Sequence, residues 1–304
     1  MIVVRSISEA QSLALNGPTV VTIGSFDGVH RGHQQLIDAM FEKNSVGKKV
    51  IITFSPHPAK VLSSQPPALI FSEKDQIEVF SKKGIDILFF IPFTREIANC
   101  SAETFIETIL VQIFAPKLLV IGYDFSFGKG KQGGFELLQK VLSPRGVNVL
   151  RIPRYEVDGV IVSSSKIREY ITAGKVDLAA ELLGRPYYIE GVVSPGKQLG
   201  RKIGFPTVNL RCENELYPSR GVYFCQTIID DISYKGVGNI GINPTAQNSL
   251  DIKVEFHILD YQGDLYGRVL RFELIQMLRA EKRFGSVAEL QEQIAKDVEQ
   301  ARSL

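Results

Sequence analysis

The sequence predicts an α/β domain with a parallel sheet, followed by a mainly antiparallel β-barrel domain with a C-terminal helix. Up to about residue 184, continuous apolar runs alternate with helical stretches, which is typical of parallel strands buried on both faces. Residues 187–275 instead hold short runs rich in Val, Ile, Tyr and Phe, separated by Gly, Pro and Asn. A chain of 304 residues also exceeds most single domains. We therefore place the domains at 1–184 and 185–304.

The elements of the first domain follow from the length and period of each apolar run. Strands are expected at 19–23, 50–54, 85–92, 118–123 and 148–152, and helices at 30–44, 73–83, 101–114 and 134–142. Two short helices, 165–173 and 176–183, are expected to close this half. The last helix is predicted from "SVAELQEQIAKDVEQA", with Ser286 as N-cap. Its apolar stripe is expected to consist of Val287, Leu290, Ile294 and Val298.

Composition excludes several classes of protein. The net charge of +2 and pI of about 8.3 are too balanced for a dedicated nucleic-acid binder. No apolar run approaches the ~20 residues of a membrane helix, and we see no signal peptide. The cysteines Cys100, Cys212 and Cys225 are far apart and form no CxxC pair, so we expect small buried thiols in a reducing cytoplasm.

The stretch "VVTIGSFDGVHRGHQQLI", residues 20–37, runs from a strand through a tight loop into a helix. Gly24, Gly28 and Gly32 let backbone N–H groups approach a ligand, and the helix start offers its positive dipole end. His30 and His33 share a helix face. We expect phosphate contact here, at the carboxyl edge of a parallel sheet.

Two other interpretations of this histidine pair stay open. Zinc binding would need a third ligand, which His57 could supply. Alternatively, both histidines are structural and have satisfied hydrogen bonds. A Walker A motif is excluded, because GxxxxGK[ST] occurs nowhere in the chain.

Two further segments suit an acidic ligand. In "SSSKIREYI", residues 163–171, serines suit the helix N-cap, but Lys166 and Arg168 lie where the helix dipole disfavours cations. A bound anion would compensate for this unfavourable interaction. Alternatively, the two side chains extend along the surface so that their charges are solvated by water. In "IGYDFSFGKGKQGG", residues 121–134, a strand ends in an acid, aromatic residues and a Gly/Lys loop, which could also be a mobile surface turn.

With GxFDGVHxGH and a downstream SSSKIR, the first half resembles the HxGH nucleotidyltransferase superfamily, which has a Rossmann-like fold. "FSPHP" and "GYDFSFGKGKQGG" narrow this to the adenylyltransferase module of bacterial bifunctional riboflavin kinase/FAD synthetases. The resemblance implies transfer of AMP from ATP to FMN, with release of pyrophosphate. It implies ATP binding by Gly24, Phe26, Asp27, His30, His33, Ser164, Ser165 and Arg168, with His30, His33 and Arg168 catalytic, and flavin binding by Asp124 and Phe125.

Two positions depart from that family's pattern. Ser165 stands where Thr is common, which retains a hydroxyl. Ser126 stands where the family often has Arg, which puts in doubt a flavin or phosphate contact from this position.

The second half holds "GKQLGRKIGFPTVNL", residues 196–210, in which basic residues surround glycines that could wrap phosphates. Pro206 fixes the backbone before Thr207 and Asn209, whose side chains point the same way in an extended chain. A hydroxyl and an amide oxygen side by side suit Mg²⁺ with ATP phosphates. A basic Gly-rich hairpin without a ligand is the alternative.

Two other segments of this half are informative. "GVGNIG", residues 236–241, matches GxGxxG, but Pro244 follows and no helix opens, so we expect a bulged barrel strand. "VEFHILD" places Glu255 and His257 on one strand face. Glu255 could take a proton from an alcohol that attacks ATP, or it could be an exposed strand-face residue.

GRxxGFPTxN, NIGxxPT, a Glu-x-His strand, "LYG" and "LRAEKRF" make residues 185–304 similar to the riboflavin kinase domain. The resemblance implies that Thr207 and Asn209 bind Mg²⁺ and that Glu255 is the general base. Val208 replaces the family's usual Ala, for which we expect a packing change. The implied ATP-binding residues are Gly196, Lys197, Gly200, Arg201, Gly204, Thr207 and Asn209, and the implied flavin contacts are Arg279 and Phe284.

The leading hypothesis is a cytoplasmic two-site enzyme of FAD biosynthesis. It would phosphorylate riboflavin with ATP and Mg²⁺ in the barrel, and adenylylate FMN to FAD in the first domain. Its partners would be riboflavin, FMN, FAD and ATP, without nucleic acid or membrane, in a monomer or weak homo-oligomer. The alternatives are an enzyme that keeps one of the two activities, and a non-catalytic flavin sensor that regulates gene expression.

Overall fold

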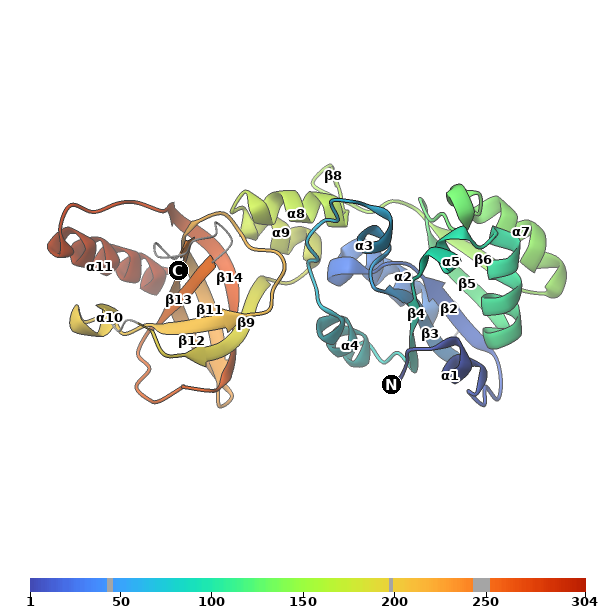
Figure 1. The fold of residues 1–304 in the computed structure, drawn as a ribbon, viewed down its shortest axis with the longest axis horizontal. Helices are drawn as coiled ribbons and strands as arrows, with labels where there is room; N and C mark the ends of the chain where they lie inside the picture. The colour runs from blue at the N-terminus through green and yellow to red at the C-terminus, as the bar shows by residue number, and fades with distance from the viewer. Residues whose placement is uncertain (43–45, 197–198, 243–251) are drawn as a thin grey trace. The chain divides into compact units, whose positions relative to one another are not determined.

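A computed structural model describes the chain except for residues 43–45, 197–198 and 243–251. The chain forms two compact units, Met1–Val162 and Ser163–Leu304 (Figure 1). This division lies ahead of the boundary at 184 that the sequence predicts, because the helices at 164–172 and 176–183 group with the barrel. The limits of the functional domains stay a prediction.

The first unit is built on a six-stranded parallel sheet with the strand order β1-β4-β3-β2-β5-β6. Its strands are β1 (Ile2–Val4), β2 (Thr19–Ile23), β3 (Lys48–Ser55), β4 (Ile87–Pro92), β5 (Pro116–Gly122) and β6 (Asn148–Ile152). All five residues of β2 are buried, as expected of a central strand covered on both faces. The parallel sheet is confirmed, while β1 was missed because three residues give no periodic signal.

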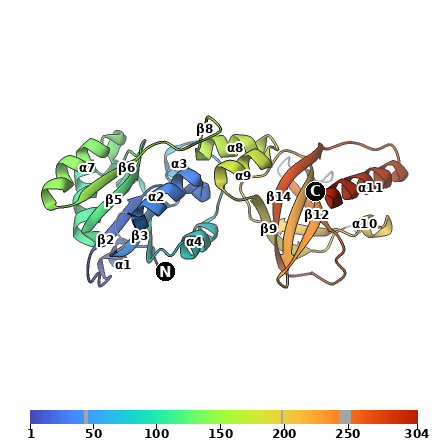
Figure 2. The ribbon, with the colours of Figure 1, turned by 180° about the vertical axis from the view of Figure 1, so that it is seen from behind.

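Helices cover both faces of this sheet (Figures 1 and 2). The helices are α1 (Ile7–Gln11), η1 (Asp27–Val29), α2 (Arg31–Glu42), α3 (Pro58–Leu62), α4 (Glu73–Lys82), α5 (Arg95–Asn99), α6 (Ala102–Phe105), η2 (Ile106–Phe114), η3 (Lys129–Lys131), α7 (Phe135–Leu142) and η4 (Ser143–Arg145), and a small hairpin pairs β7 (Glu156–Val157) with β8 (Val160–Ile161). Residues of α6, η2 and α7 share one apolar core with alternate residues of β2, β3, β4 and β5. The helix predicted at 101–114 continues as a π-helix from Ile106.

The second unit is a closed antiparallel barrel with the strand order β10-β13-β12-β11-β14-β9, as predicted. Its strands are β9 (Tyr187–Ser194), β10 (Val208–Cys212), β11 (Gly221–Ile229), β12 (Ile232–Ile242), β13 (Ile252–Ile258) and β14 (Val269–Ala280). Phe256 and Phe272 stack inside it with 3.8 Å between ring centroids. Gly238 makes room for Phe256, since a Cβ there would lie 2.4 Å from the ring. The GxGxxG sequence is therefore part of a barrel strand.

The described part of the second unit also contains four helices, which are α8 (Ser164–Thr172), α9 (Val176–Leu183), α10 (Leu199–Lys202) and α11 (Val287–Ser303). α9 packs against β14 and β9, which explains why α8 and α9 group with the barrel and do not close the first half. Ser286 caps α11 as predicted, with its side chain accepting from the Glu289 N–H at 3.2 Å.

The expected apolar stripe of α11 is wrong in part, because Val287 is 57% exposed. The most buried residues of this helix are Asp297 and Ala301. Asp297 accepts hydrogen bonds from Nε and Nη2 of Arg279 in β14, at 3.0 and 2.8 Å. An ion pair thus supplements the apolar contacts of this helix with the barrel.

Candidate functional site

The loop after β2 is held in an unusual backbone shape. Phe26 and Gly28 both have positive φ, of 50° and 78°, and the short helix η1 leads directly into α2. Asp27 is 1% exposed, and its carboxylate accepts hydrogen bonds from the backbone N–H groups of Ile70 at 3.0 Å and Phe71 at 3.1 Å. These hydrogen bonds indicate that Asp27 fixes the shape of the loop.

The two histidines of this loop and helix form one unit. The rings of His30 and His33 are stacked, with 3.6 Å between centroids and 15° between planes. The backbone N–H of His33 donates to Nδ1 of His30 at 3.3 Å, so neutral His30 carries its proton on Nε2. Gly32 permits this arrangement, because a Cβ there would lie 3.3 Å from the His30 ring.

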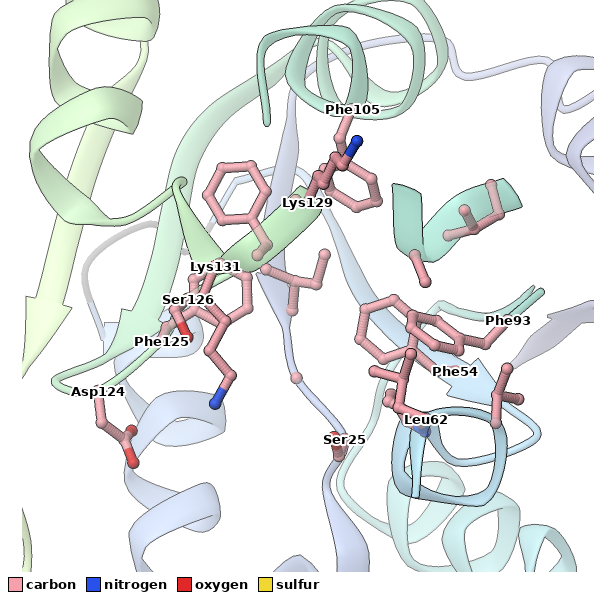
Figure 3. A pocket seen from close by; sticks show the side chains of 18 of the residues that line it. Ser25, Phe54, Leu62, Phe93, Phe105, Asp124, Phe125, Ser126, Lys129 and Lys131 are labelled. Carbon is pink, nitrogen blue, oxygen red and sulfur yellow. The ribbon is translucent and has the colours of Figure 1, made fainter. Parts of the chain in front are cut away.

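A pocket of about 1050 Å³ opens beside this pair (Figure 3). Ile23, Phe54, Phe93 and Gly122 line it at or next to the carboxyl ends of four parallel strands. His33 contributes from α2, while His30 lies behind it and is 6% exposed. The volume is at the upper end of the range for small-molecule sites, which leaves room for two substrates.

The pocket combines aromatic walls with cations. Figure 3 shows Phe54 and Phe93 on one side and Phe125, Ser126 and Lys131 on the other, and the first two rings meet edge to face at 5.4 Å. Arg95 and Lys129 also line it, and Asp124 is the one acidic side chain among the lining residues that the structure describes. Such a site suits a flat aromatic ligand that carries phosphate.

The loop 123–134 is anchored to the domain. Phe127 and Gly133 pair through two backbone hydrogen bonds, of 3.0 and 2.9 Å. Gly128 and Gly133 lie so close to Ala102 that a Cβ at either would come within 2.9 Å of it. This packing argues against a mobile surface turn, and it directs Phe125 and Ser126 to the pocket.

The zinc interpretation finds no support. Outside the three gaps in the description, no group of three or more His, Cys, Asp or Glu side chains could hold a metal ion. His57 instead caps α3, with its Nδ1 accepting from the Ala59 N–H at 3.2 Å.

The serines and arginine of "SSSKIREYI" lie at the start of α8, in the second unit. Ser163 caps this helix by accepting from the Lys166 N–H at 3.2 Å, which places Ser164 and Ser165 in its first turn. Arg168 follows in the same helix, and Lys166 pairs with Glu169 at 2.7 Å. Their contact with ATP stays a prediction.

The barrel brings two of the predicted kinase residues together, next to an asparagine that was not predicted. Asn209 in β10 lies directly opposite Glu255 in β13, and Asn239 in β12 lies opposite Glu255 on its other side. Directly paired residues of antiparallel strands project from the same face. Val254, Phe256 and Ile258 are buried, so Glu255 and His257 lie on the opposite face of β13, as predicted.

Two glycines bring the preceding loop against Thr207 and Asn209. A Cβ at Gly196 would lie 2.9 Å from the Asn209 amide oxygen, and one at Gly200 would lie 3.4 Å from the Thr207 hydroxyl. Arg201 and Thr207 line a second pocket, of about 520 Å³. Gly204 has a φ of 87°, which favours glycine. Lys197 lies outside the described residues.

The neighbours of Glu255 are charged and polar. Lys253 forms an ion pair with it, with Nζ 2.7 Å from Oε2. Nδ1 of His257 lies 2.7 Å from the Pro206 carbonyl oxygen. Burial lowers the pKa of His257, against the opposing effect of this hydrogen bond.

Arg279, near the end of β14, lies close to Phe284, which follows that strand. The Arg279 guanidinium lies 5.7 Å from the centre of the Phe284 ring while it pairs with Asp297. Their contact with flavin stays a prediction.

Sequence reasoning missed several pocket residues, among them Phe93, Arg95, Phe105 and Lys131. The position of Phe93 directly after a buried strand could have predicted its place in the pocket, because the carboxyl ends of parallel strands lie at one edge of the sheet. Lys253 was also missed, although a Lys two residues before Glu255 must share its strand face.

Comparison with known proteins assigns the family. A family model for FAD synthetase matches residues 13–166, and one for riboflavin kinase matches residues 183–304. The chain is 36% identical to a bifunctional riboflavin kinase/FMN adenylyltransferase of Escherichia coli K12, over 93% of this chain and 91% of that protein. The chain belongs to the riboflavin kinase/FMN adenylyltransferase family. The enzyme of the same name from Pseudomonas fluorescens is also 36% identical, with coverage of 94% and 92%.

A solved structure matches this family member over its whole length. A crystal structure described as a macrolide-efflux protein from Streptococcus pneumoniae superposes with a TM-score of 0.92, at 27% identity, and covers 100% of both chains. In the described part of this chain, no helix is long and apolar enough to cross a membrane.

Proposed function

We propose that this chain makes FMN from riboflavin in its second unit and FAD from FMN in its first, with ATP as the co-substrate of both steps. The family assignment supports both activities. The observation that carries the first-unit assignment is the stacked histidine pair beside a pocket with aromatic walls and three cationic side chains.

In the first unit, a phosphate oxygen of FMN attacks the α-phosphorus of ATP. The bond from that phosphorus to the bridging oxygen breaks, and pyrophosphate leaves with its electron pair. The step needs alignment and cationic stabilisation more than a covalent nucleophile. We assign this stabilisation to His30 and His33, whose stacked rings hold each other in place at the carboxyl end of β2.

The pocket suggests how the substrates divide between its walls. Gly24, Phe26 and His33 belong to the ATP side, because the loop and α2 offer backbone N–H groups to phosphates. Asp124 and Phe125 belong to the flavin side, where Phe125 stacks on Phe127 at 5.4 Å and so presents a fixed ring face.

Ser164, Ser165 and Arg168 would hold the triphosphate. Two hydroxyls in the first turn of α8 and a guanidinium further along it match a polyanion, since the helix start itself favours negative charge.

A product assay separates the two units. Purified protein is incubated with riboflavin, ATP and Mg²⁺, and the flavins are resolved by chromatography over time. Wild type should form FMN before FAD. His30→Ala should accumulate FMN with FAD formation lowered by about 100-fold or more. A His30→Ala protein that forms FAD at the wild-type rate would overturn the assignment.

In the second unit, the residues present fit a magnesium ion. Thr207 and Asn209 offer hydroxyl and amide oxygens, the hard ligands that Mg²⁺ takes together with nucleotide phosphates. Glycines at 196 and 200 let the loop backbone lie close to both groups, since a Cβ would come within 2.1 Å of the Asn209 amide and 3.4 Å of the Thr207 hydroxyl. When bound, Mg²⁺ would neutralise charge on the ATP phosphates.

Glu255 would act as general base of the kinase step. Its carboxylate accepts the proton of the riboflavin 5′-hydroxyl while the hydroxyl oxygen attacks the γ-phosphorus, and ADP leaves with the electron pair of the broken bond. Glu255→Gln keeps the shape but cannot take the proton, so FMN formation should fall by about 100-fold or more. Glu292→Gln, at an exposed pair with Lys296, is the matched control. Equal FMN formation by Glu255→Gln and wild type would refute this role.

We also propose that the protein acts in the cytoplasm on small molecules, without nucleic acid or membrane partners, as a monomer or weak homo-oligomer. Its three cysteines form no disulfide, which supports a reducing compartment. Light scattering of the purified protein across concentrations tests the oligomeric state.

A further inference from the structure

The carboxylate of Glu255 already has a cationic partner on one of its two oxygens. Lys253 and Glu255 are two residues apart in β13, so both side chains project from the outer face of the strand. Nζ of Lys253 lies 2.7 Å from Oε2, and the side chains are 34% and 20% exposed. This is a charge-assisted hydrogen bond to a mostly covered carboxylate.

The paired residues of the neighbouring strands place no charge opposite this contact. Gly241, which has no side chain, lies directly opposite Lys253 in β12. Asn209 and Asn239 lie opposite Glu255, and neither is charged. Another carboxylate approaches this region, because a Cβ at Gly241 would lie 2.8 Å from Oε1 of Glu281.

We propose that Lys253 is a positioning residue of the kinase site, which fixes Oε2 of Glu255 so that Oε1 faces the riboflavin hydroxyl. The inference rests on the proposed role of Glu255. Partly exposed Lys–Glu pairs add little to stability, so a stabilising role alone gives weak reason for this contact. Orientation of a general base matters more, because a displacement of about 1 Å can cost about 100-fold in rate.

The first test is the kinetics of FMN formation by the full-length protein. Lys253→Met removes the ammonium but keeps an unbranched side chain. We expect its kcat to fall by about 10-fold, with KM for ATP and riboflavin within about twofold of wild type. Lys253→Arg should recover most of the loss, since a guanidinium also donates to a carboxylate. Lys296→Met, at an exposed pair with Glu292, is the matched control and should leave kcat unchanged.

A double-mutant cycle ties the effect to Glu255. In a Glu255→Gln background, Lys253→Met should cause little further loss, because the group it orients has gone. FAD formation from added FMN, which depends on the first unit, should stay at the wild-type rate in every variant.

The outcomes separate the two ideas. Normal kcat in Lys253→Met together with a large loss in Glu255→Gln would overturn the positioning role and leave the general base intact. Normal activity in Glu255→Gln would overturn the proposed function itself. An equal loss from Lys253→Met in both backgrounds would show that Lys253 acts independently of Glu255, and would also overturn the inference.

Discussion

His30 and His33 lie ring on ring, with 3.6 Å between their centroids, and the backbone N–H of His33 donates to the ring of His30. Because each ring limits the movement of the other, the pair is preorganised for the phosphate contact that we propose. Preorganised hydrogen-bond donors stabilise a transition state most effectively, since they need no reorganisation during the reaction.

Substitutions in this pair should not be additive. His33→Ala should lower kcat/KM for FAD formation by about 100-fold, as should His30→Ala, because either change removes one ring and loosens the other. The double variant should be less than about 10-fold worse than either single variant. Steady-state assays with FMN and ATP measure all three. Losses that multiply would mean that the two histidines act separately.

Gly32 should affect activity without loss of stability. A Cβ at this position would lie 3.3 Å from the His30 ring, so Gly32→Ala should shift the ring and slow FAD formation by about 10-fold. Alanine is also the better helix former, and the free energy of unfolding should therefore stay constant or rise by up to about 1 kcal/mol. Parallel activity and urea-unfolding measurements check both parts.

Asp38→Ala provides the control for that variant. Asp38 is an exposed residue of the same helix, at an ion pair of 3.5 Å with Lys83. It should leave FAD formation unchanged. A Gly32→Ala protein as active as Asp38→Ala would contradict the close-packing argument.

Much of this architecture is readable from local patterns. β2 was predicted at its observed limits because five consecutive apolar or β-branched residues precede a glycine. In β13, alternation alone placed Glu255 and His257 on one face and Phe256 on the other. Such predictions succeed where the side-chain period of the strand decides the environment.

Other features depend on contacts between distant segments and give no local signal. No local pattern predicts that the Asp27 carboxylate accepts hydrogen bonds from the backbone N–H groups of residues 70 and 71. An aspartate in a surface helix is usually exposed, but Asp297 is buried and forms an ion pair with Arg279. Neither contact could be foreseen without knowing which elements pack together.

The Arg279–Asp297 pair should matter for the stability of the barrel. Its side chains are only 22% and 4% exposed, so Asp297→Ala leaves a mostly buried guanidinium without its carboxylate. We expect a loss of about 3 kcal/mol in the free energy of unfolding. This loss can be measured from the urea concentration at which half of the kinase activity has disappeared. Glu292→Gln, which breaks an exposed pair, should cost less than about 0.5 kcal/mol; equal costs would contradict a structural role for the buried pair.

Glu73 should make the stability of the first unit depend on pH. Burial acts to raise the pKa of its carboxyl, but hydrogen bonds from Ser55 and Arg5, together with the Arg5 charge, outweigh burial and hold the pKa below its ordinary value of 4.5. A carboxyl whose pKa is lower in the folded state adds stability above pH 4.5, which is lost as the pH falls through the folded pKa.

Glu73→Gln should therefore be less stable than wild type at pH 7 but equal to it in more acidic solution. The difference at pH 7 should be about 1 kcal/mol or less, because the Glu73 and Arg5 side chains are 40% and 52% exposed and water screens their attraction. Urea unfolding of both proteins between pH 7 and about pH 2, followed by hydrogen exchange of first-unit amides, tests this. A difference that stays constant over that range would show that the carboxylate charge of Glu73 does not contribute.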